Sequence, residues 1–164
     1  MEKEELLNNL KELFLKHNLT VSSAESCTGG LISSYLTDIS GSSAFIFQNF
    51  VTYSNDAKMK FLNVKKETLE KYGAVSEQTA LEMGAGLKPY SDVSVTTTGI
   101  LGPTGGTKEK PVGLCYISLR YKDTIKVIKY ISKKASGNIR YEIKKDIVEF
   151  ALLQLLLFLK NILK

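Results

Sequence analysis

Histidine is almost missing from this sequence, which has a single one, His17, in 164 residues. The segment LKHNL places His17 at the end of an expected helix, which indicates a residue at a helix terminus on the surface. Without a histidine at the site, the Ser-His-Asp and Cys-His mechanisms are excluded. An activated serine would then need a lysine, a tyrosine or a carboxylate as its base, and a lysine can serve when burial or a nearby positive charge keeps it neutral.

Cysteine is scarce as well, with only Cys27 and Cys115. Two cysteines do not form a disulfide framework, and they fit a reducing cytoplasm. Imidazole and thiolate groups are few and never paired at ligand spacing, so we expect no metal. No apolar run approaches the ~20 residues that span a bilayer, and the amino-terminal segment MEKEELLNNLKELF is acidic and amphipathic, unlike a signal peptide. We therefore expect a cytoplasmic protein with no membrane partner.

Signatures of nucleic-acid and dinucleotide binding are also lacking. The net charge is +5, but the lysines are spread along the chain, without interleaved aromatic residues and without helix-turn-helix or zinc-finger spacing. We expect no nucleic-acid partner, whereas a positive balance suits a small anionic ligand. The stretch GPTGGTK at 102–108 has the wrong spacing for a P-loop, and no GxGxxG follows a strand. P-loop and Rossmann sites are therefore excluded.

The chain has the length and composition of one soluble domain covering residues 1–164. Hydrophobic periodicity, caps and turn residues predict five strands, at 19–24, 44–53, 93–98, 112–121 and 124–131. Helices are expected at 3–17, 31–37, 55–62, 66–72, 76–87 and from Gly137 onward. This order favours an α/β fold with a mixed sheet covered on both faces. The last helix contains ALLQLLLFL, which indicates either a deeply buried core helix or a subunit interface.

The segment AESCTGG, residues 24–30, places two potential nucleophiles at the end of an expected strand. Ser26 stands at the sheet edge where α/β proteins bind ligands. The N–H groups of Thr28, Gly29 and Gly30 are expected to point out of the following helix start, where they suit an oxyanion or a phosphate. A purely structural turn is the alternative. Cys27 has the same opportunity for a low pKa, or is a small buried apolar residue.

The segment VTYSNDAKMKFL, residues 51–62, supplies a possible base. Tyr53 ends the expected strand, Asn55 caps the next helix, and Lys58 falls in its first turn. There the helix dipole disfavours a positive charge and would lower the pKa of the lysine. The alternative is that Tyr53 is an interface aromatic and that Lys58 is solvated.

The segment TTTGILGPTGGTKEKPVG, residues 96–113, has five glycines and two prolines, more than a turn requires. Close approach of the backbone to a ligand explains this composition, and a mobile surface loop explains it as well. The sequence alone leaves these two interpretations open.

Taken together, AESCTGG, GSSAF, VTYSNDAK, GAVS and TGILGPTGGTKEKPVG, in this order, resemble the C-terminal domain family of the competence/damage-inducible CinA proteins. Stand-alone members of that family include nicotinamide-nucleotide amidohydrolase. The resemblance runs from about residue 4 to the final helix. It implies a three-layer α/β/α sandwich that self-associates, with a dimer favoured, and hydrolysis of nicotinamide mononucleotide to nicotinate mononucleotide and ammonia without a cofactor.

The resemblance also assigns roles to residues. It places the nucleophile at Ser26 and the remainder of a Ser-Tyr-Lys arrangement at Tyr53 and Lys58. Contacts to the nucleotide substrate are then expected from the turn and the glycine-rich loop, at Cys27, Thr28, Gly29, Gly30, Thr98, Gly99, Gly102, Pro103, Gly105 and Gly106.

Two departures from the family pattern affect these expectations. Leu101 replaces the usual alanine of TGIAGP, and its larger side chain would narrow or reshape the pocket. SGNIR replaces the usual GDR motif and puts Arg140 one residue later, where we expect it to meet the substrate phosphate. A non-catalytic nucleotide-binding or regulatory module, and an amidase for another small carboxamide, are the alternative functions.

Overall fold

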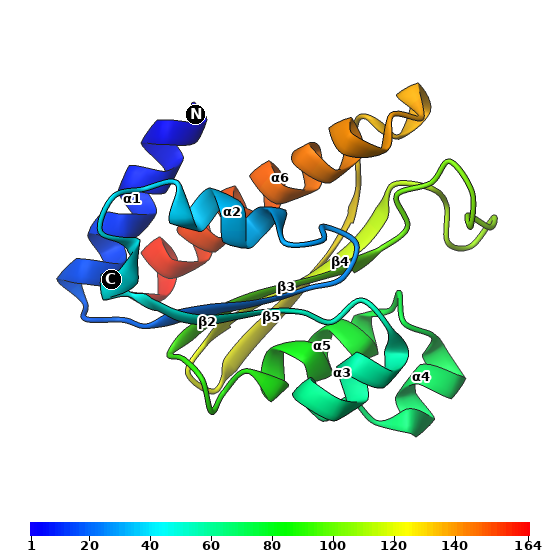
Figure 1. The fold of residues 1–164 in the computed structure, drawn as a ribbon, viewed down its shortest axis with the longest axis horizontal. Helices are drawn as coiled ribbons and strands as arrows, with labels where there is room; N and C mark the ends of the chain where they lie inside the picture. Colours follow the sequence, from blue (N-terminus) through cyan, green and yellow to red (C-terminus); the bar gives the residue numbers. More distant parts are fainter.

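The computed structural model describes all residues 1–164 and contains eleven regular helices and strands joined by short connections (Figure 1). The α-helices are α1 (Lys3–Lys16), α2 (Leu31–Thr37), α3 (Asn55–Leu62), α4 (Lys66–Tyr72), α5 (Glu77–Gly86) and α6 (Arg140–Ile162). The strands are β1 (Val21–Glu25), β2 (Ile46–Val51), β3 (Val93–Gly99), β4 (Leu114–Tyr121) and β5 (Thr124–Ile131). Every predicted helix and strand is therefore present.

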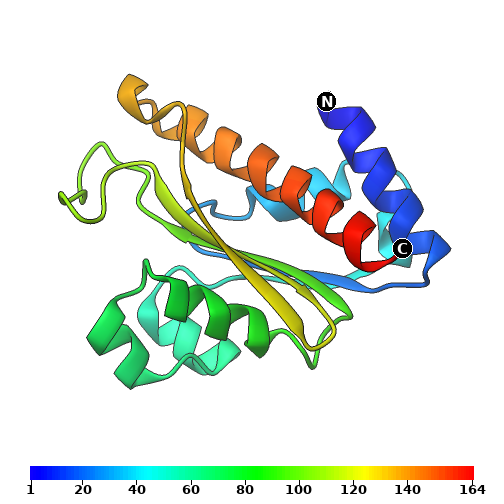
Figure 2. The same cartoon turned by 180° about the vertical axis from the view of Figure 1, so that it is seen from behind.

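The strands form one mixed sheet in the order β2-β1-β3-β4-β5. Strand β1 is parallel to both β2 and β3, whereas β4 is antiparallel to both of its neighbours, β3 and β5. Helices α1, α2 and α6 cover one face of the sheet, and α3, α4 and α5 cover the other (Figures 1 and 2). The predicted three-layer α/β/α architecture with a mixed sheet is confirmed.

The crossovers leaving β1 and β2 lie on opposite faces of the sheet. The chain leaves β1 through α2 on one face, and it leaves β2 through α3 on the other (Figure 1). The carboxyl ends of these parallel strands are adjacent, since Glu25 is paired with Val51 and, on its other side, with Thr97. In open α/β sheets such a switch point is where ligands bind.

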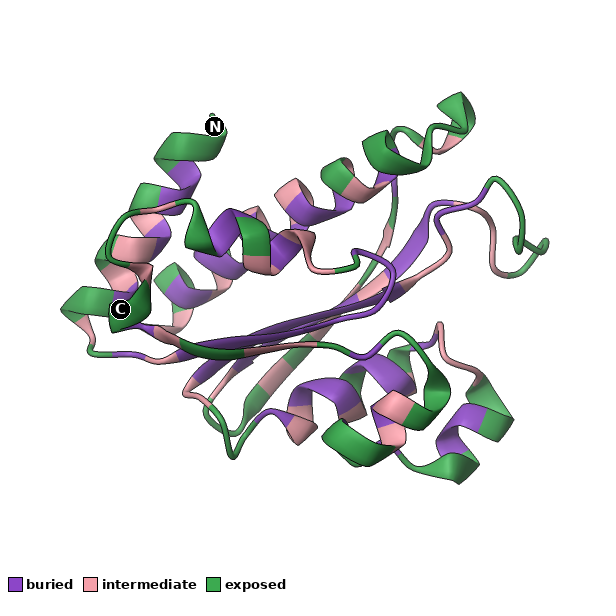
Figure 3. Ribbon diagram, viewed as in Figure 1, coloured by how far each residue is buried: buried purple, intermediate pink, exposed green.

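The larger hydrophobic core lies between the sheet and the layer of α1, α2 and α6 (Figure 3). Helix α6 contributes eight fully buried side chains to this core, which are Ile143, Ile147, Val148, Ala151, Leu152, Leu155, Leu156 and Leu159. Among its large hydrophobic residues only Tyr141, in the first turn, and Leu157 are exposed, at 57% and 50%. The apolar character of this helix is thus explained chiefly by burial within the chain, which supports the core interpretation.

Three local expectations are corrected. Ser54, not Asn55, caps α3, because its hydroxyl accepts a hydrogen bond of 3.0 Å from the Ala57 N–H. Residues 42–44 form a 3₁₀ turn, so that β2 begins at Ile46 and ends at Val51, before Tyr53. Tyr53 and Lys58 are therefore both carried by the segment that leaves the sheet and starts α3.

Arg120 of β4 is a fully buried arginine that ties the end of α5 to the sheet. The five N–H groups of its guanidinium donate to six acceptors, which are the hydroxyls of Ser91 and Ser94 and the carbonyls of Leu87, Ser91, Asp92 and Lys122. Replacing Arg120 by alanine is expected to lower the free energy of unfolding by about 3 kcal/mol, because buried acceptors lose their donor and a cavity remains. Urea denaturation measures this change.

The matched control is Arg140→Ala, since the chain has only these two arginines and Arg140 is exposed. Its guanidinium makes two hydrogen bonds at the surface, so we expect a loss of less than about 1 kcal/mol. Equal losses in the two variants would contradict this account of Arg120.

Candidate active site

Ser26 and Lys58 meet at the carboxyl ends of β1 and β2. The Lys58 Nζ donates a hydrogen bond of 3.1 Å to the Ser26 Oγ, and two more to the carbonyls of Thr52 (3.0 Å) and Tyr53 (3.2 Å). Lys58 is 1% exposed and Ser26 is 8% exposed. The expectation of a solvated Lys58 is therefore wrong, and a nucleophile–base pair in direct contact is present.

The surroundings of Lys58 favour its neutral form. Burial lowers the pKa of the Lys58 ammonium, and Cys27 opposes this shift only in part. No carboxylate forms a salt bridge or a hydrogen bond with Lys58. A buried lysine without a counter-charge can accept a proton at a pH where an exposed lysine cannot.

Two left-handed glycines shape the turn after Ser26. Gly29 has φ 59° and Gly30 has φ 102°, values that side chains disfavour. The Gly29 N–H donates to the Ser26 carbonyl at 3.0 Å, whereas the N–H groups of Thr28 and Gly30 have no acceptor in the chain. The expectation of three available donors is thus corrected to two, because Gly29 closes the turn.

Tyr53 contacts the Ser26–Lys58 pair through its main chain. Its carbonyl lies 3.4 Å from the Ser26 Oγ and accepts from Lys58. Its side chain is 61% exposed, and the hydroxyl accepts a hydrogen bond of 3.2 Å from an Nη of Arg140. No hydrogen bond joins the Tyr53 hydroxyl to Ser26 or Lys58, so the phenol is not in contact with the other two members of the expected Ser-Tyr-Lys arrangement.

Arg140 begins α6 and links two of the predicted segments. One Nη donates to the Gly102 carbonyl at 2.7 Å and the other to the Tyr53 hydroxyl. The shifted position of this arginine therefore still places its guanidinium between the glycine-rich loop and the segment that carries Lys58. In both ribbon views the loop after β3 extends toward the end of the molecule where α6 begins (Figures 1 and 2).

The glycine-rich loop is held by close backbone approaches. A Cβ on Gly99 would lie 2.6 Å from the Leu114 carbonyl, and one on Gly106 would lie 2.8 Å from the Val112 nitrogen. Thr98 is buried, and its hydroxyl donates to the Ala74 carbonyl. Packing against the chain thus explains part of this glycine content. No hydrogen bond connects any of the six residues predicted in this segment, Thr98, Gly99, Gly102, Pro103, Gly105 and Gly106, with Ser26 or Lys58.

Residues 3–159 match the model of the CinA C-terminal domain family. The chain belongs to this family. It is 56% identical over 122 residues to a CinA-like protein of Fusobacterium nucleatum, covering 74% of this chain and 30% of that protein. It is 46% identical over 151 residues to a CinA-like protein of Kosmotoga olearia, covering 91% and 35%. The chain thus spans about a third of the length of these curated relatives.

Solved CinA structures have the same fold. The competence/damage inducible protein CihA from Agrobacterium tumefaciens superposes with a TM-score of 0.87 at 44% identity, over 96% of this chain and 95% of that one. The CinA superfamily protein KP700603 from Klebsiella pneumoniae gives 0.90 at 27% identity, over 98% and 99%. The five-stranded sheet and its two helical layers are therefore those of CinA proteins.

In this CinA domain, Cys27 and Leu101 belong to the core. The Cys27 Sγ lies 3.9 Å from the Cys115 Sγ, and both thiols are buried. Burial is the main cause that raises the pKa of Cys115. Leu101 is 2% exposed and packs in the larger core cluster. Ser26, by contrast, contacts Lys58. The two adjacent potential nucleophiles of the turn between β1 and α2, residues 26–30 (the CinA turn), therefore have different surroundings.

Two polar residues near the CinA turn were missed by the sequence reasoning. Glu25 is fully buried and accepts hydrogen bonds from Thr28 in the turn and from the start of α2. The Lys144 Nζ lies 3.5 Å from where a Cβ on Gly29 would be. Lys144 is four residues after Arg140, hence on the same face of α6, and this spacing could have indicated it.

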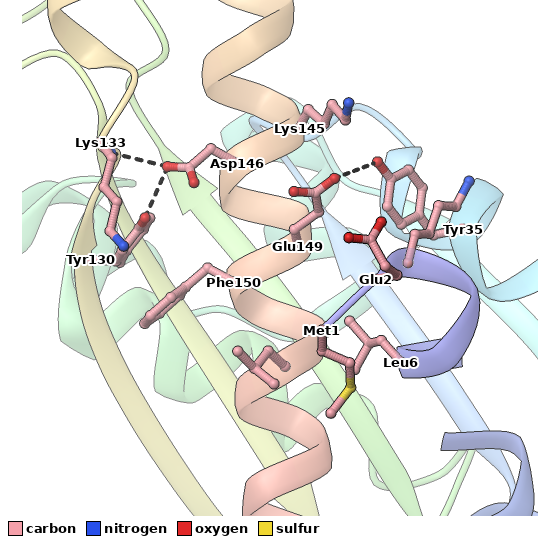
Figure 4. A pocket seen from close by; sticks show the side chains of 12 residues that line it. Met1, Glu2, Leu6, Tyr35, Tyr130, Lys133, Lys145, Asp146, Glu149 and Phe150 are labelled. Carbon is pink, nitrogen blue, oxygen red and sulfur yellow. Dashed lines mark hydrogen bonds between the residues drawn. The ribbon is translucent and has the colours of Figure 1, made fainter. Parts of the chain in front are cut away.

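A separate groove of about 480 Å³ lies between α6 and the start of α1 (Figure 4). It is lined by Tyr35, Tyr130, Glu149, Phe150 and other residues, and none of the predicted site residues is among them.

No cluster of three or more His, Cys, Asp or Glu side chains could hold a metal ion. None of the helices has the length and apolar character needed to cross a membrane.

Proposed function

We propose that this CinA domain is an amidohydrolase that converts nicotinamide mononucleotide to nicotinate mononucleotide and ammonia. The observation that carries the proposal is the 3.1 Å contact between the Lys58 Nζ and the Ser26 Oγ, in a setting where burial lowers the pKa of the lysine. The family resemblance supports the choice of substrate.

In the proposed mechanism, neutral Lys58 takes the proton of the Ser26 hydroxyl, and the Oγ attacks the carboxamide carbon. The N–H groups of Thr28 and Gly30, which have no acceptor in the chain, stabilise the tetrahedral oxyanion. Protonated Lys58 then gives its proton to the leaving nitrogen, so that ammonia departs and an acyl-enzyme remains. Water, activated by Lys58, hydrolyses this ester and restores Ser26.

Tyr53 and Arg140 have positioning and binding roles in this proposal. The Tyr53 carbonyl helps to hold Lys58, and its hydroxyl holds Arg140 at the mouth of the site. The Arg140 guanidinium binds the substrate phosphate, because its fork of N–H donors matches phosphate oxygens. Lys144 adds a second positive charge beside the turn. The backbone of the loop from Gly99 to Gly106 completes the substrate contacts.

The decisive experiment is ammonia release from nicotinamide mononucleotide by the purified protein, with nicotinate mononucleotide identified by chromatography. Turnover of this substrate supports the proposal. Tight binding of the nucleotide without turnover would instead favour a regulatory nucleotide-binding module. If ammonia is released only from other small carboxamides tested beside the mononucleotide, the protein is instead an amidase that acts on a different substrate.

Replacing Arg140 by alanine is expected to raise KM for nicotinamide mononucleotide about 10- to 100-fold, with a smaller change in kcat, because a bound phosphate loses its charge-assisted hydrogen bonds. Steady-state kinetics on the mononucleotide and on nicotinamide riboside measure the effect. The riboside has no phosphate, so its kcat/KM should be nearly the same in both proteins. An equal loss on both substrates would show that Arg140 does not act through the phosphate.

A further inference from the structure

We propose that Glu25 is the positioning residue that holds the nucleophile turn in its reactive shape. The inference rests on the proposed function, since it concerns the turn that carries Ser26. Glu25 is the last residue of β1 and directly precedes Ser26. It is 0% exposed, and the mechanism described above makes no use of it.

Both carboxylate oxygens of Glu25 are fully occupied. One oxygen accepts from the Thr28 hydroxyl at 2.8 Å and from the Ile32 N–H at 2.7 Å. The other accepts from the N–H and the hydroxyl of Ser33, at 3.0 and 2.8 Å. Each oxygen thus has two donors; one of the four is in the turn, at Thr28, and the other three are in α2. No basic side chain pairs with this carboxylate.

The main chain of Glu25 is held as firmly as its side chain. Its carbonyl accepts from the Thr52 N–H at 2.8 Å, and the next N–H, that of Ser26, donates to the Thr97 carbonyl. Thr28 is also tied to the sheet, because its hydroxyl lies 2.7 Å from the Thr97 hydroxyl. Residues 26–30 are therefore clamped between a backbone fixed in the sheet and a carboxylate that reaches across the turn.

This clamp has two consequences for the site. It satisfies the first free N–H groups of α2, those of Ile32 and Ser33, inside the protein. It also fixes the start of the turn relative to α2, while the N–H groups of Thr28 and Gly30 stay without acceptors. Loss of the clamp would shift the Ser26 Oγ relative to the Lys58 Nζ, and small displacements of reacting groups have large effects on rate.

Glu25 acts through geometry and not as an acid or a base. Its oxygens are buried and already accept four hydrogen bonds, so they have no free position toward a substrate. Burial lowers the pKa of Lys58 and Cys27 raises it in part, whereas Glu25 makes no contribution to the shift. A change at Glu25 should therefore alter the rate of attack by Ser26 and leave the pH midpoint of that attack in place.

The test compares Glu25→Gln with Glu82→Gln. Glu82 is a matched control because its carboxylate also accepts at the start of a helix, from the Lys65 N–H at 2.8 Å and from the Thr68 hydroxyl. Two readouts are used. One is kcat and KM for nicotinamide mononucleotide, and the other is the rate constant for labelling of Ser26 by a fluorophosphonate, followed by mass spectrometry at several pH values. Both are measured at a temperature well below the thermal unfolding midpoint of each variant.

We expect Glu25→Gln to lower kcat and the labelling rate about 10- to 100-fold with KM changed less than about threefold, because the N–H of Ile32 or of Ser33 at the start of α2 loses its acceptor and the turn is no longer fixed to the helix. Glu82→Gln should retain both rates. If Glu25→Gln does not fold, Ser33→Ala takes its place, since it removes one donor to the carboxylate. Its control is Ser34→Ala, whose exposed side chain makes no hydrogen bond.

Equal losses in the Glu25 and Glu82 variants, a loss confined to KM, or a shifted pH midpoint of labelling would each overturn the inference. The proposed function can fail separately. A wild-type protein that is labelled at Ser26 but releases no ammonia from the mononucleotide would reject the substrate, and the labelling rates would still decide on Glu25. A Glu25→Gln protein as active as the wild type would reject only the role of Glu25.

Discussion

Replacing Lys58 by methionine is expected to reduce ammonia release about a thousandfold, because the Ser26 hydroxyl then has no group to take its proton. Methionine has nearly the length of lysine and suits the buried site, where Lys58 is 1% exposed. Steady-state kinetics with nicotinamide mononucleotide give the change in kcat, and circular dichroism shows whether the fold is kept. Substrate affinity, measured by calorimetry, should change little.

Lys60→Met is the matched control for this variant. Lys60 lies on the same helix, two residues further along, and is exposed. Its replacement should leave kcat within about twofold of the wild type, because surface substitutions away from the site have small effects. Similar losses in both variants would show that the loss of either lysine of α3 impairs the protein without a specific role for Lys58, and a fully active Lys58→Met protein would eliminate Lys58 as the base.

The pH dependence gives an independent signature of Lys58. Because burial lowers its pKa in the folded protein, the unfolded chain binds more protons between the folded pKa and the ordinary value near 10.5. The free energy of unfolding should therefore rise with pH across that window and fall as the pH drops through the folded pKa. Hydrolysis should rise with pH through the same folded pKa. Urea denaturation at several pH values should show this contribution in the wild type and its absence in Lys58→Met.

The sheet and the approximate site followed from the sequence because both depend on local signals. Alternating apolar residues and turn residues placed every strand, and the order of elements indicated a mixed sheet covered on both faces. Ser26, Tyr53 and Gly99 then fell at or just beyond the carboxyl ends of neighbouring strands, where the structure has them. These segments lie together because the strands that precede them are neighbours in the sheet, and the order of strands and helices along the sequence is enough to indicate such an arrangement.

What the sequence did not reveal depends on side-chain direction. Whether Lys58 faces the sheet or solvent depends on how α3 leaves β2, and that exit is set by the Ser54 cap and by the carbonyls of Thr52 and Tyr53. The same exit turns the phenol of Tyr53 outward to Arg140. Glu25 was missed because a single glutamate before a turn carries no pattern, and its four hydrogen bonds exist only once α2 is folded back over β1.

Replacing Ser26 by alanine is expected to lower kcat about a thousandfold or more, since the acyl-enzyme can no longer form while the remaining groups still bind the substrate. The substitution removes only the hydroxyl oxygen of a residue that is 8% exposed, so the fold should be unaffected. Burst kinetics and mass spectrometry of the quenched reaction would show the covalent intermediate in the wild type and its loss in Ser26→Ala.

Cys27→Ala is the control that separates the two neighbouring nucleophiles. The Cys27 thiol packs in the core beside Cys115, so its removal should lower the free energy of unfolding by about 1 kcal/mol through the small cavity left behind, with kcat nearly unchanged. If activity instead survived in Ser26→Ala and disappeared in Cys27→Ala, the attacking atom would be the thiolate. The contact between Lys58 and Ser26 favours the serine, because the base is in reach of its hydroxyl.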